Sequence, residues 1–425
     1  MTSTADQARP DLPGDLEALA MLTAGTSYAD AVHQLLAVVR TQLGMQVAWV
    51  SEFVGADQVL RFVDAAPGAQ APAEGTRRPL GGSFCARVLD GRFPAVIPDT
   101  RGVPAAALLD ITAELRIGAY VGVPLLGPHG VAVGMLFAVH DTARPQLGDR
   151  DVAALRLLVQ LLHDLQARAV SAAQAVEERS RMRAALEAIV AGHGRHPVLQ
   201  PIVDLVSGRA VAAEGLTRFT ASSPAAAEGR TTAQWFDDSA RLGMREALEL
   251  ATAGAVLDLL DDGVPEHAAV SVNLSPQTLV SERLPALLAG RPLRRVVIEV
   301  TEHAPVSDYA ALAGSLEPYR AHGLRLAVDD AGAGYASLQH VLDVRPDFIK
   351  IDMALVRGAD VDLPRRTLLT ALADFAEATG CRLVAEGVET DGELRAVAAC
   401  GVHLGQGYLL GRPDRDPSWS GFPLP

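Results

Sequence analysis

The sequence predicts an α/β protein in which two domains are joined by a helix, and three observations support this. With 425 residues, the chain is long enough for two domains. Hydrophobic residues make up 49% of it, and they recur in short strand-like runs that alternate with segments of helical period. From Gly148 to about Ala191 the helical pattern is continuous, with mixed segments on either side.

Composition limits the location and the class of partner. The sequence has no run of eighteen apolar residues and no signal-peptide pattern at its start, so we expect a cytoplasmic protein without membrane insertion. Cys85, Cys381 and Cys400 are far apart, which argues against disulfides and structural zinc. The net charge of −14 disfavours nucleic acid, so an anionic ligand would need metal ions or a placed Arg or Lys.

The first domain is expected over residues 15–167, as a compact α/β domain of sensor type. Apolar runs bounded by Gly and Pro predict its strands, at Gln46–Val54, Leu60–Asp64, Pro94–Ile97, Ala119–Leu126 and Val131–Val139. Helical spacing predicts its helices, at Leu16–Leu43, Ser83–Leu89 and Ala105–Leu115. The segment Pro67–Arg78 is a loop by composition.

Three segments of this domain, SFCARVLDG, PAVIPDT and AYVGVPLLGPHGVAVGMLFAV, together with the following helix, resemble a GAF domain. The resemblance implies a domain that holds a small ligand or chromophore, or that serves as a dimerisation platform, and it leaves that choice and the ligand open. Cys85 could be an attachment point for a chromophore, but we expect a small core residue on an amphipathic helix.

A helical linker is expected over residues 168–192. Its apolar stripe begins in the preceding domain and steps by threes and fours, at Leu155, Leu158, Leu162, Leu165, Ala169, Ala172 and Val176. A helix packed only on its own domain would show such a stripe for about two turns. Because the stripe continues further, we favour a parallel dimeric linker.

The second domain is expected over residues 193–425. Strand-like runs alternate with helical segments, at Val198–Asp204, Ala210–Arg218, Ala268–Leu274, Val296–Thr301, Leu324–Val328, Asp347–Ile351, Arg382–Ala385 and His403–Leu409. Eight strands with helices between them predict a TIM-like (β/α)₈ barrel, whose active site lies at the carboxyl ends of the strands.

Polar side chains occur on or just after seven of these strands. They are Glu214, Asn273, Glu299, Asp329 with Asp330, Lys350 with Asp352, Glu386 with Glu389, and Gln406. So many carboxylates on one rim would repel each other unless cations neutralised them. We therefore expect a site for two divalent cations, with Mg²⁺ or Mn²⁺ favoured by the oxygen donors.

Eight motifs of this domain then bring in a resemblance to a known family. In chain order they read QPIVDL, EGLTR, VNLSP, EVTE, DDAGAG, IKID, EGVE and QGYLLGRP, within Val198–Pro413. Together they resemble the EAL domain, the phosphodiesterase family that hydrolyses cyclic di-GMP. The resemblance covers about half of the chain.

The resemblance implies roles at matching positions. One cation would be held by Glu214, Asn273, Glu299 and Asp329. Asp329 would bridge to a second cation held by Asp330 and Glu386. The catalytic group would comprise Lys350, which orients or activates the attacking water, with Asp352, Glu386 and Glu389. The substrate would be bound by Gln200, Leu216, Arg218 and Gln406.

One loop departs from the family pattern. Glu302 would anchor the loop Ala331–Tyr335, but Ala331 and Ala333 stand where a phenylalanine and a threonine are usual. Losing that hydroxyl removes a hydrogen-bond partner for Glu302, which would loosen the segment that carries Asp330. The name motif also has Gly215 in place of alanine, a change from one small residue to another.

We therefore expect a metal-dependent phosphodiesterase that converts cyclic di-GMP to linear 5′-pGpG under control of a GAF sensor, as a homodimer through the linker helix or the barrel. Two alternatives stay open. A catalytically weak or inactive receptor would bind cyclic di-GMP and signal to a partner, which the altered loop favours. An interaction protein without nucleotide binding is disfavoured by the complete set of ligand positions.

Overall fold

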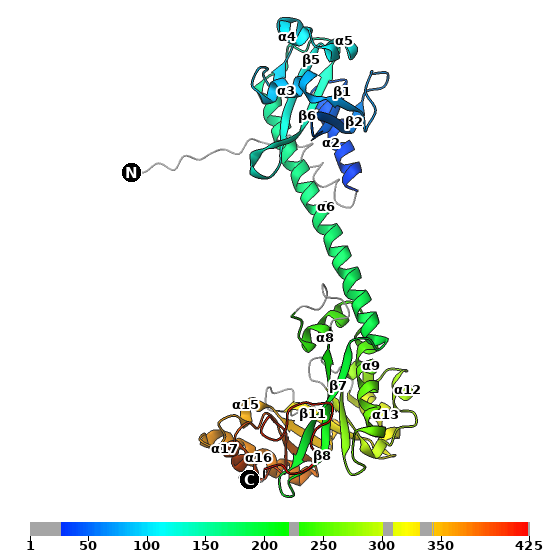
Figure 1. Cartoon of the computed structure of the whole chain (residues 1–425), viewed down its shortest axis with the longest axis vertical. Helices are drawn as coiled ribbons and strands as arrows, with labels where there is room; N and C mark the ends of the chain where they lie inside the picture. The colour runs from blue at the N-terminus through cyan, green and yellow to red at the C-terminus, as the bar shows by residue number, and fades with distance from the viewer. Residues whose placement is uncertain (1–26, 221–228, 301–308, 332–341, 343, 424–425) are drawn as a thin grey trace, which may run out of the picture. The chain divides into compact units, whose positions relative to one another are not determined.

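The computed structural model describes residues 27–220, 229–300, 309–331, 342 and 344–423. These residues form two compact units that divide between Val176 and Glu177 (Figure 1). The first includes the predicted sensor domain and the second the predicted barrel, so the α/β fold class is confirmed. The predicted bounds 15–167, 168–192 and 193–425 stay predictions. No described helix is both long and apolar enough to cross a membrane.

A six-stranded antiparallel sheet of order β3-β2-β1-β6-β5-β4 is the centre of the first unit. Its strands are β1 (Val47–Val54), β2 (Asp57–Ala65), β3 (Arg77–Pro79), β4 (Val96–Ile97), β5 (Ala119–Leu126) and β6 (Ala132–His140). The edge strand β3 was not predicted, because it is only three residues long and lies at the end of the segment expected as a loop.

Helices cover both faces of this sheet (Figure 1). Helix α2 (Tyr28–Gln42) and the first turns of α6 (Asp149–Val190) share one apolar cluster with the sheet. The other face packs against α3 (Phe84–Leu89), α4 (Pro104–Ala107) and α5 (Asp110–Glu114). Three 3₁₀ turns complete the unit: η1 (Leu80–Gly82), η2 (Thr100–Gly102) and η3 (Pro128–Gly130).

The single helix predicted over Ala105–Leu115 is two short helices instead. Leu109 between them is extended, with φ −74° and ψ 135°. This break leaves Leu108 84% exposed while Leu109 is buried in the core. Tertiary packing therefore overrides a helical pattern that is continuous in the sequence.

Helix α6 is continuous over 42 residues, as predicted (Figure 1). Leu155, Leu158 and Leu162 belong to the core of the first unit. Along the middle of the helix, Val170 and Val176 are 50% and 66% exposed. The last turns, which belong to the second unit, are buried again through a separate apolar cluster.

The second unit is a closed eight-stranded barrel of order β10-β11-β12-β13-β14-β7-β8-β9. Its strands are β7 (Arg195–Asp204), β8 (Arg209–Phe219), β9 (Ala269–Leu274), β10 (Val296–Val300), β11 (Arg325–Ala331), β12 (Phe348–Ile351), β13 (Arg382–Ala385) and β14 (Leu404–Gly405). The predicted barrel is confirmed, and each strand overlaps its predicted segment.

One strand departs from a regular (β/α)₈ barrel. Strand β7 runs antiparallel to both of its neighbours, β8 and β14, whereas every other pair is parallel. Only residues 205–208 join β7 to β8, and Asp204 Oδ1 accepts the backbone N–H of Ser207 at 2.9 Å in that turn. So short a connection allows a hairpin but no crossover helix.

Helices surround the barrel (Figure 1). They are α8 (Thr232–Arg241), α9 (Arg245–Leu257), α10 (Leu259–Asp262), α11 (Pro276–Leu279), α12 (Leu284–Leu288), η4 (Leu293–Arg295), α13 (Tyr309–Arg320), α15 (Met353–Val356), α16 (Leu363–Thr379) and α17 (Asp391–Ala399). Two large apolar clusters lie between helices and strands, one around β8–β11 and one around β11–β13.

Candidate active site

Lys350, on β12, is the centre of the site. Its side chain is 2% exposed, and four carboxylate oxygens surround its Nζ, at 2.6 Å (Glu386 Oε1), 2.7 Å (Glu299 Oε2), 3.3 Å (Asp329 Oδ1) and 3.4 Å (Glu214 Oε2). The four carboxylates come from or just after β8, β10, β11 and β13. The convergence that the sequence predicted at one end of the barrel is therefore present.

Burial and charge shift the pKa values of this cluster. Burial raises the pKa of Glu299 to about 8 and that of Glu386 to about 7, against the opposing effect of Lys350. Burial would lower the pKa of the Lys350 ammonium, but the surrounding carboxylates raise it well above its ordinary value. One ammonium cannot neutralise four carboxylates, so the site favours added positive charge or protons.

Amide side chains complete the cluster. Asn273 Nδ2 donates to Glu214 Oε1 at 3.0 Å, and Gln406 Nε2 donates to Glu214 Oε2 at 2.7 Å. Gln406 Nε2 also lies 3.1 Å from Gln200 Oε1, and Gln200 Nε2 donates to the carbonyl oxygen of Gly411. Gln406 Oε1 is buried without a hydrogen-bond partner in the described structure, so it can accept from a group that enters the site.

Backbone hydrogen bonds hold the segment that carries Glu386 beside the segment that carries Gln406. Val388 N donates to Gln406 O at 3.0 Å, and Gln406 N donates to Ala385 O at 2.8 Å. A Cβ on Gly407 would collide with the backbone of Val388. Only glycine allows these two segments to approach so closely, which explains its place in the QGYLLGRP motif.

A pocket of about 380 Å³ opens beside the cluster, within the range of small-molecule sites. Its lining comprises Gln200, Glu214, Asp352, Met353, Arg357, Glu386, Gly387, Glu389, Gln406, Gly407 and Tyr408. Glu389 Oε1 lies 2.7 Å from Arg357, and Asp352 accepts the backbone N–H of Ala354 at 2.6 Å. Both acids face the pocket but have other partners than Lys350, and their catalytic roles stay predictions.

The other predicted residues differ in how far the structure describes them. Leu216 and Arg218 follow Glu214 at alternate positions of β8, so the three share one face of the strand, and Arg218 is exposed. Asp330 belongs to β11, but its side chain is outside the described part. Glu302 and the loop residue Ala333 lie outside the described residues as well.

Sequence reasoning did not single out Met353, Arg357 and Tyr408 as pocket residues. Met353 directly follows the motif IKID, and Tyr408 lies within the motif QGYLLGRP. Their positions in these motifs could therefore have indicated that they belong to the site. Arg357 carries no such signal: it follows α15 as its C-cap, and only the fold brings it to Glu389.

The donors fit hard divalent cations. Glu214, Glu299, Asp329 and Glu386 offer carboxylate oxygens, and Asn273 offers an amide oxygen, the ligand types that Mg²⁺ and Mn²⁺ prefer. Within the described residues, no three His, Cys, Asp or Glu side chains are already arranged to hold an ion. Lys350 Nζ lies where the carboxylates converge, and it supplies positive charge there.

A wide pocket of about 580 Å³ lies beside Arg116 and Asp141 in the first unit, and a much smaller cavity lies in its core. This cavity measures about 20 Å³, the room of one water molecule, and lies between the sheet and α3 and α5. Trp49 Nε1 borders it, buried and without a hydrogen-bond partner in the described structure, while the Tyr120 hydroxyl lies beside Cys85. Cys85 is 1% exposed, and burial raises the pKa of its thiol to about 12, so it is a core residue.

Family models match both units. The EAL domain model matches residues 182–413, and the GAF domain model matches residues 27–163. The chain belongs to the EAL-domain family. Its EAL domain carries the site around Lys350, and its GAF domain contains the six-stranded sheet.

Two curated relatives and one solved structure are similar to this chain. The chain is 29% identical over 228 residues to the probable cyclic di-GMP phosphodiesterase PdeB of Escherichia coli, covering 50% of this chain and 41% of PdeB. It is 29% identical over 320 residues to the cyclic di-GMP phosphodiesterase PA2567 of Pseudomonas aeruginosa, covering 69% of this chain and 51% of PA2567. The matches thus span about half of these relatives or less.

A manganese/cy-diGMP complex of BlrP1 from Klebsiella pneumoniae is similar at a TM-score of 0.48 and 28% identity, over 55% of this chain and 60% of that chain.

Proposed function

We propose that the protein hydrolyses cyclic di-GMP to linear 5′-pGpG with two divalent cations, Mg²⁺ or Mn²⁺, bound at the end of the barrel. The observation that carries the proposal is the cluster of four carboxylates around Lys350, open to a pocket of about 380 Å³. The names of the curated relatives support the substrate.

The cations would lie among Glu214, Asn273, Glu299, Asp329, Asp330 and Glu386. Bound there, they would supply Lewis-acid activation of water and stabilise charge on the attacked phosphate. The raised pKa values of Glu299 and Glu386 support this assignment, because buried carboxyl groups that resist ionisation become good ligands once positive charge is added.

The chain's own side chains would orient the reactants. The ammonium of Lys350, held by Glu299 and Glu386, would offset phosphate charge and orient the attacking water. Gln406 would offer its unpaired Oε1 to that water. Arg218 would pair with the second phosphate, while Gln200 and Leu216 would contact a guanine.

Control by the GAF domain belongs to the same proposal. The support is α6, one helix whose first turns are part of the GAF core and whose last turns are part of the EAL unit. The exposed Val176, which continues the apolar stripe of α6, supports a homodimer in which the middle of α6 pairs with a second copy. The ligand of the GAF domain stays a prediction.

A receptor function is the second candidate. Ala331 and Ala333 replace the usual phenylalanine and threonine of the loop next to Asp330, which favours weak turnover with retained binding.

One assay separates the two functions. The full-length chain is incubated with cyclic di-GMP and Mn²⁺, and pGpG is followed by chromatography, while binding is measured by titration calorimetry with Ca²⁺ in place of Mn²⁺. We expect turnover with Mn²⁺. Binding without turnover would make the protein a receptor, and no binding would reject both functions.

A further inference from the structure

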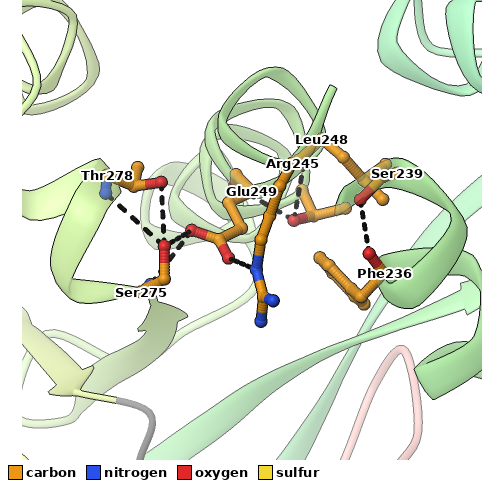
Figure 2. A network of polar contacts seen from close by, with 8 residues as sticks. Phe236, Ser239, Arg245, Leu248, Glu249, Ser275 and Thr278 are labelled. Atoms are coloured by element: carbon orange, nitrogen blue, oxygen red, sulfur yellow. Dashed lines mark hydrogen bonds and ion pairs between the residues drawn. The ribbon is translucent and has the colours of Figure 1, made fainter. Parts of the chain in front are cut away.

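Glu249 is a buried carboxylate that the site around Lys350 does not use. It lies on α9 and is 4% exposed. Its Oε2 accepts two hydrogen bonds from Ser275, from the backbone N–H at 3.0 Å and from the hydroxyl at 2.7 Å (Figure 2). Its Oε1 accepts from Arg245 Nε at 2.8 Å. A buried charge with three donors is held in one position.

Ser275 lies two residues after Asn273, where β9 ends. The β8–β9 pairing reaches Gly215 opposite Val272, one residue before Asn273. On the other side, Asn273 is opposite Glu299 and the pairing with β10 reaches Leu274. The end of β9 therefore has a strand partner on one side, and Glu249 holds the backbone just beyond it.

Ser275 also begins the next helix. Its hydroxyl accepts the backbone N–H of Thr278 at 3.4 Å as the N-cap of α11, while it donates to Glu249 (Figure 2). Ser275 thus sets the direction of the chain after Asn273, and α9 holds Ser275 through the carboxylate of Glu249.

Helix α9 is itself packed firmly. Leu248, next to Glu249, is fully buried in a cluster with Leu186 and Ile189 of α6. One turn earlier on α9, Glu246 accepts a hydrogen bond from Ser281, beyond α11. The same helix therefore contacts the last turns of α6 and the segment that follows Asn273.

We propose that Glu249 is a positioning residue for the site: by holding Ser275, it keeps the amide of Asn273 at Glu214, where a cation ligand is needed. This inference rests on the proposed function for the role of Asn273. Outer partners of metal ligands typically change metal affinity by roughly ten- to hundredfold when they are removed.

The test compares Glu249→Ala with Glu246→Ala in the full-length chain. Both substitutions remove a carboxylate that accepts a hydrogen bond from a serine hydroxyl. Only Glu249 contacts Ser275, the residue that directly follows β9. Mn²⁺ binding is measured by titration calorimetry without nucleotide, and kcat and KM are measured with cyclic di-GMP.

We expect Glu249→Ala to weaken Mn²⁺ binding roughly ten- to hundredfold and to lower kcat more than it raises KM, with Glu246→Ala near wild type. Glu249→Gln retains an oxygen acceptor for Ser275 and should restore most of the Mn²⁺ affinity. Equal Mn²⁺ affinity in Glu249→Ala and Glu246→Ala would overturn the proposal.

A second variant keeps the test decisive. If Glu249→Ala does not fold, Ser275→Ala can be used instead, because it removes only the hydrogen bond from the serine hydroxyl to Glu249. We expect Ser275→Ala to weaken Mn²⁺ binding as well. An unchanged Mn²⁺ affinity in Ser275→Ala would overturn the proposal. Failure of the proposed function is a different result, because a wild-type chain without turnover still reports Mn²⁺ affinity and its loss in Glu249→Ala.

Discussion

The small core cavity of the GAF domain and the pocket of the EAL domain both border buried groups with raised pKa values, yet they differ in kind. In the GAF cavity, burial raises the pKa values of Cys85 and Tyr120, which are neutral at physiological pH. Beside the EAL pocket, Lys350 is charged and lies among four carboxylates. The cavity has the room of about one water, whereas the pocket has about 380 Å³.

This difference shows what a perturbed pKa means. Burial alone marks a core residue, and it stabilises the neutral form without any chemistry. Opposite charges that converge from several strand ends, beside an open pocket, mark a site that can bind and react. Three predictions test this contrast between the two regions.

The largest effect is expected from removing the central charge. Lys350→Ala should lower hydrolysis of cyclic di-GMP by at least about 10²-fold, because it removes the group that we propose orients the attacking water. Initial rates with saturating Mn²⁺ measure it. The matched variant in the GAF cavity, Cys85→Ala, should lower the melting temperature and leave the rate per folded molecule unchanged. Wild-type turnover in Lys350→Ala would reject the assigned role.

The second prediction is that Glu299 of the EAL site, unlike Cys85 of the GAF core, makes the stability of the protein depend on pH. The folded-state pKa of Glu299, about 8, lies above its unfolded value of 4.5, so the folded chain binds more protons between these values. Its stabilising contribution is complete below the unfolded pKa and is lost as the pH rises through the folded one. The ion-free protein should therefore lose stability from about pH 5 to pH 8.

Calorimetric melting in the presence of a chelator checks this expectation. Glu299→Gln should flatten the decline, because the amide does not titrate. Cys85→Ala should keep the wild-type slope, since the thiol, with its pKa raised from 9.0 to about 12, titrates only above this range. An equal decline in wild type and Glu299→Gln would show that Glu299 is ionised throughout.

The smallest effect concerns one glycine in each region. A Cβ on Gly215 would collide with Val256 of α9 and lie 2.8 Å from the Ser271 carbonyl oxygen, although the family usually has alanine there. Gly215→Ala should lower the free energy of unfolding by about 1–3 kcal/mol through overpacking. It should also slow hydrolysis, because Glu214 is the preceding residue. Denaturant unfolding and initial rates measure the two effects.

A matched substitution in the GAF sheet provides the contrast. A Cβ on Gly122 would collide with Tyr120 and lie 2.7 Å from Phe137 Cβ, so Gly122→Ala should cost stability but no turnover per folded molecule. Combining Gly215→Ala with Val256→Ala should recover part of the loss, since the obstructing methyl groups are gone. If the double variant is no more stable than Gly215→Ala, overpacking is the wrong cause.

Much of the fold could be predicted because strand runs are local patterns. Arg382–Ala385 and Ala119–Leu126 were predicted with the bounds that the structure shows. Glu214, Asn273, Glu299, Asp329 and Lys350 were predicted to meet, since each lies near the carboxyl end of a strand. A shared end of a barrel turns separate local patterns into one site.

The features that could not be predicted from the sequence depend on contacts between residues that are distant in the chain. The pairing of β7 with β14, some two hundred residues later, closes the barrel and has no local signal in the sequence. The pairing of Glu389 with Arg357 depends on the two loops that the barrel brings together. Glu249 carried no motif, and only the packing of α9 beside β9 gave it Ser275 as a partner.

The amino-acid sequence was enough to predict the order of strands and helices, the long helix α6 and the residues that could hold cations, because alternation, helical period and motifs are patterns of a few neighbouring residues. The folded structure was needed to find which charges neutralise each other, how large each pocket is, and which buried groups hold the site in place. These depend on distances between side chains that only closure of the barrel brings together.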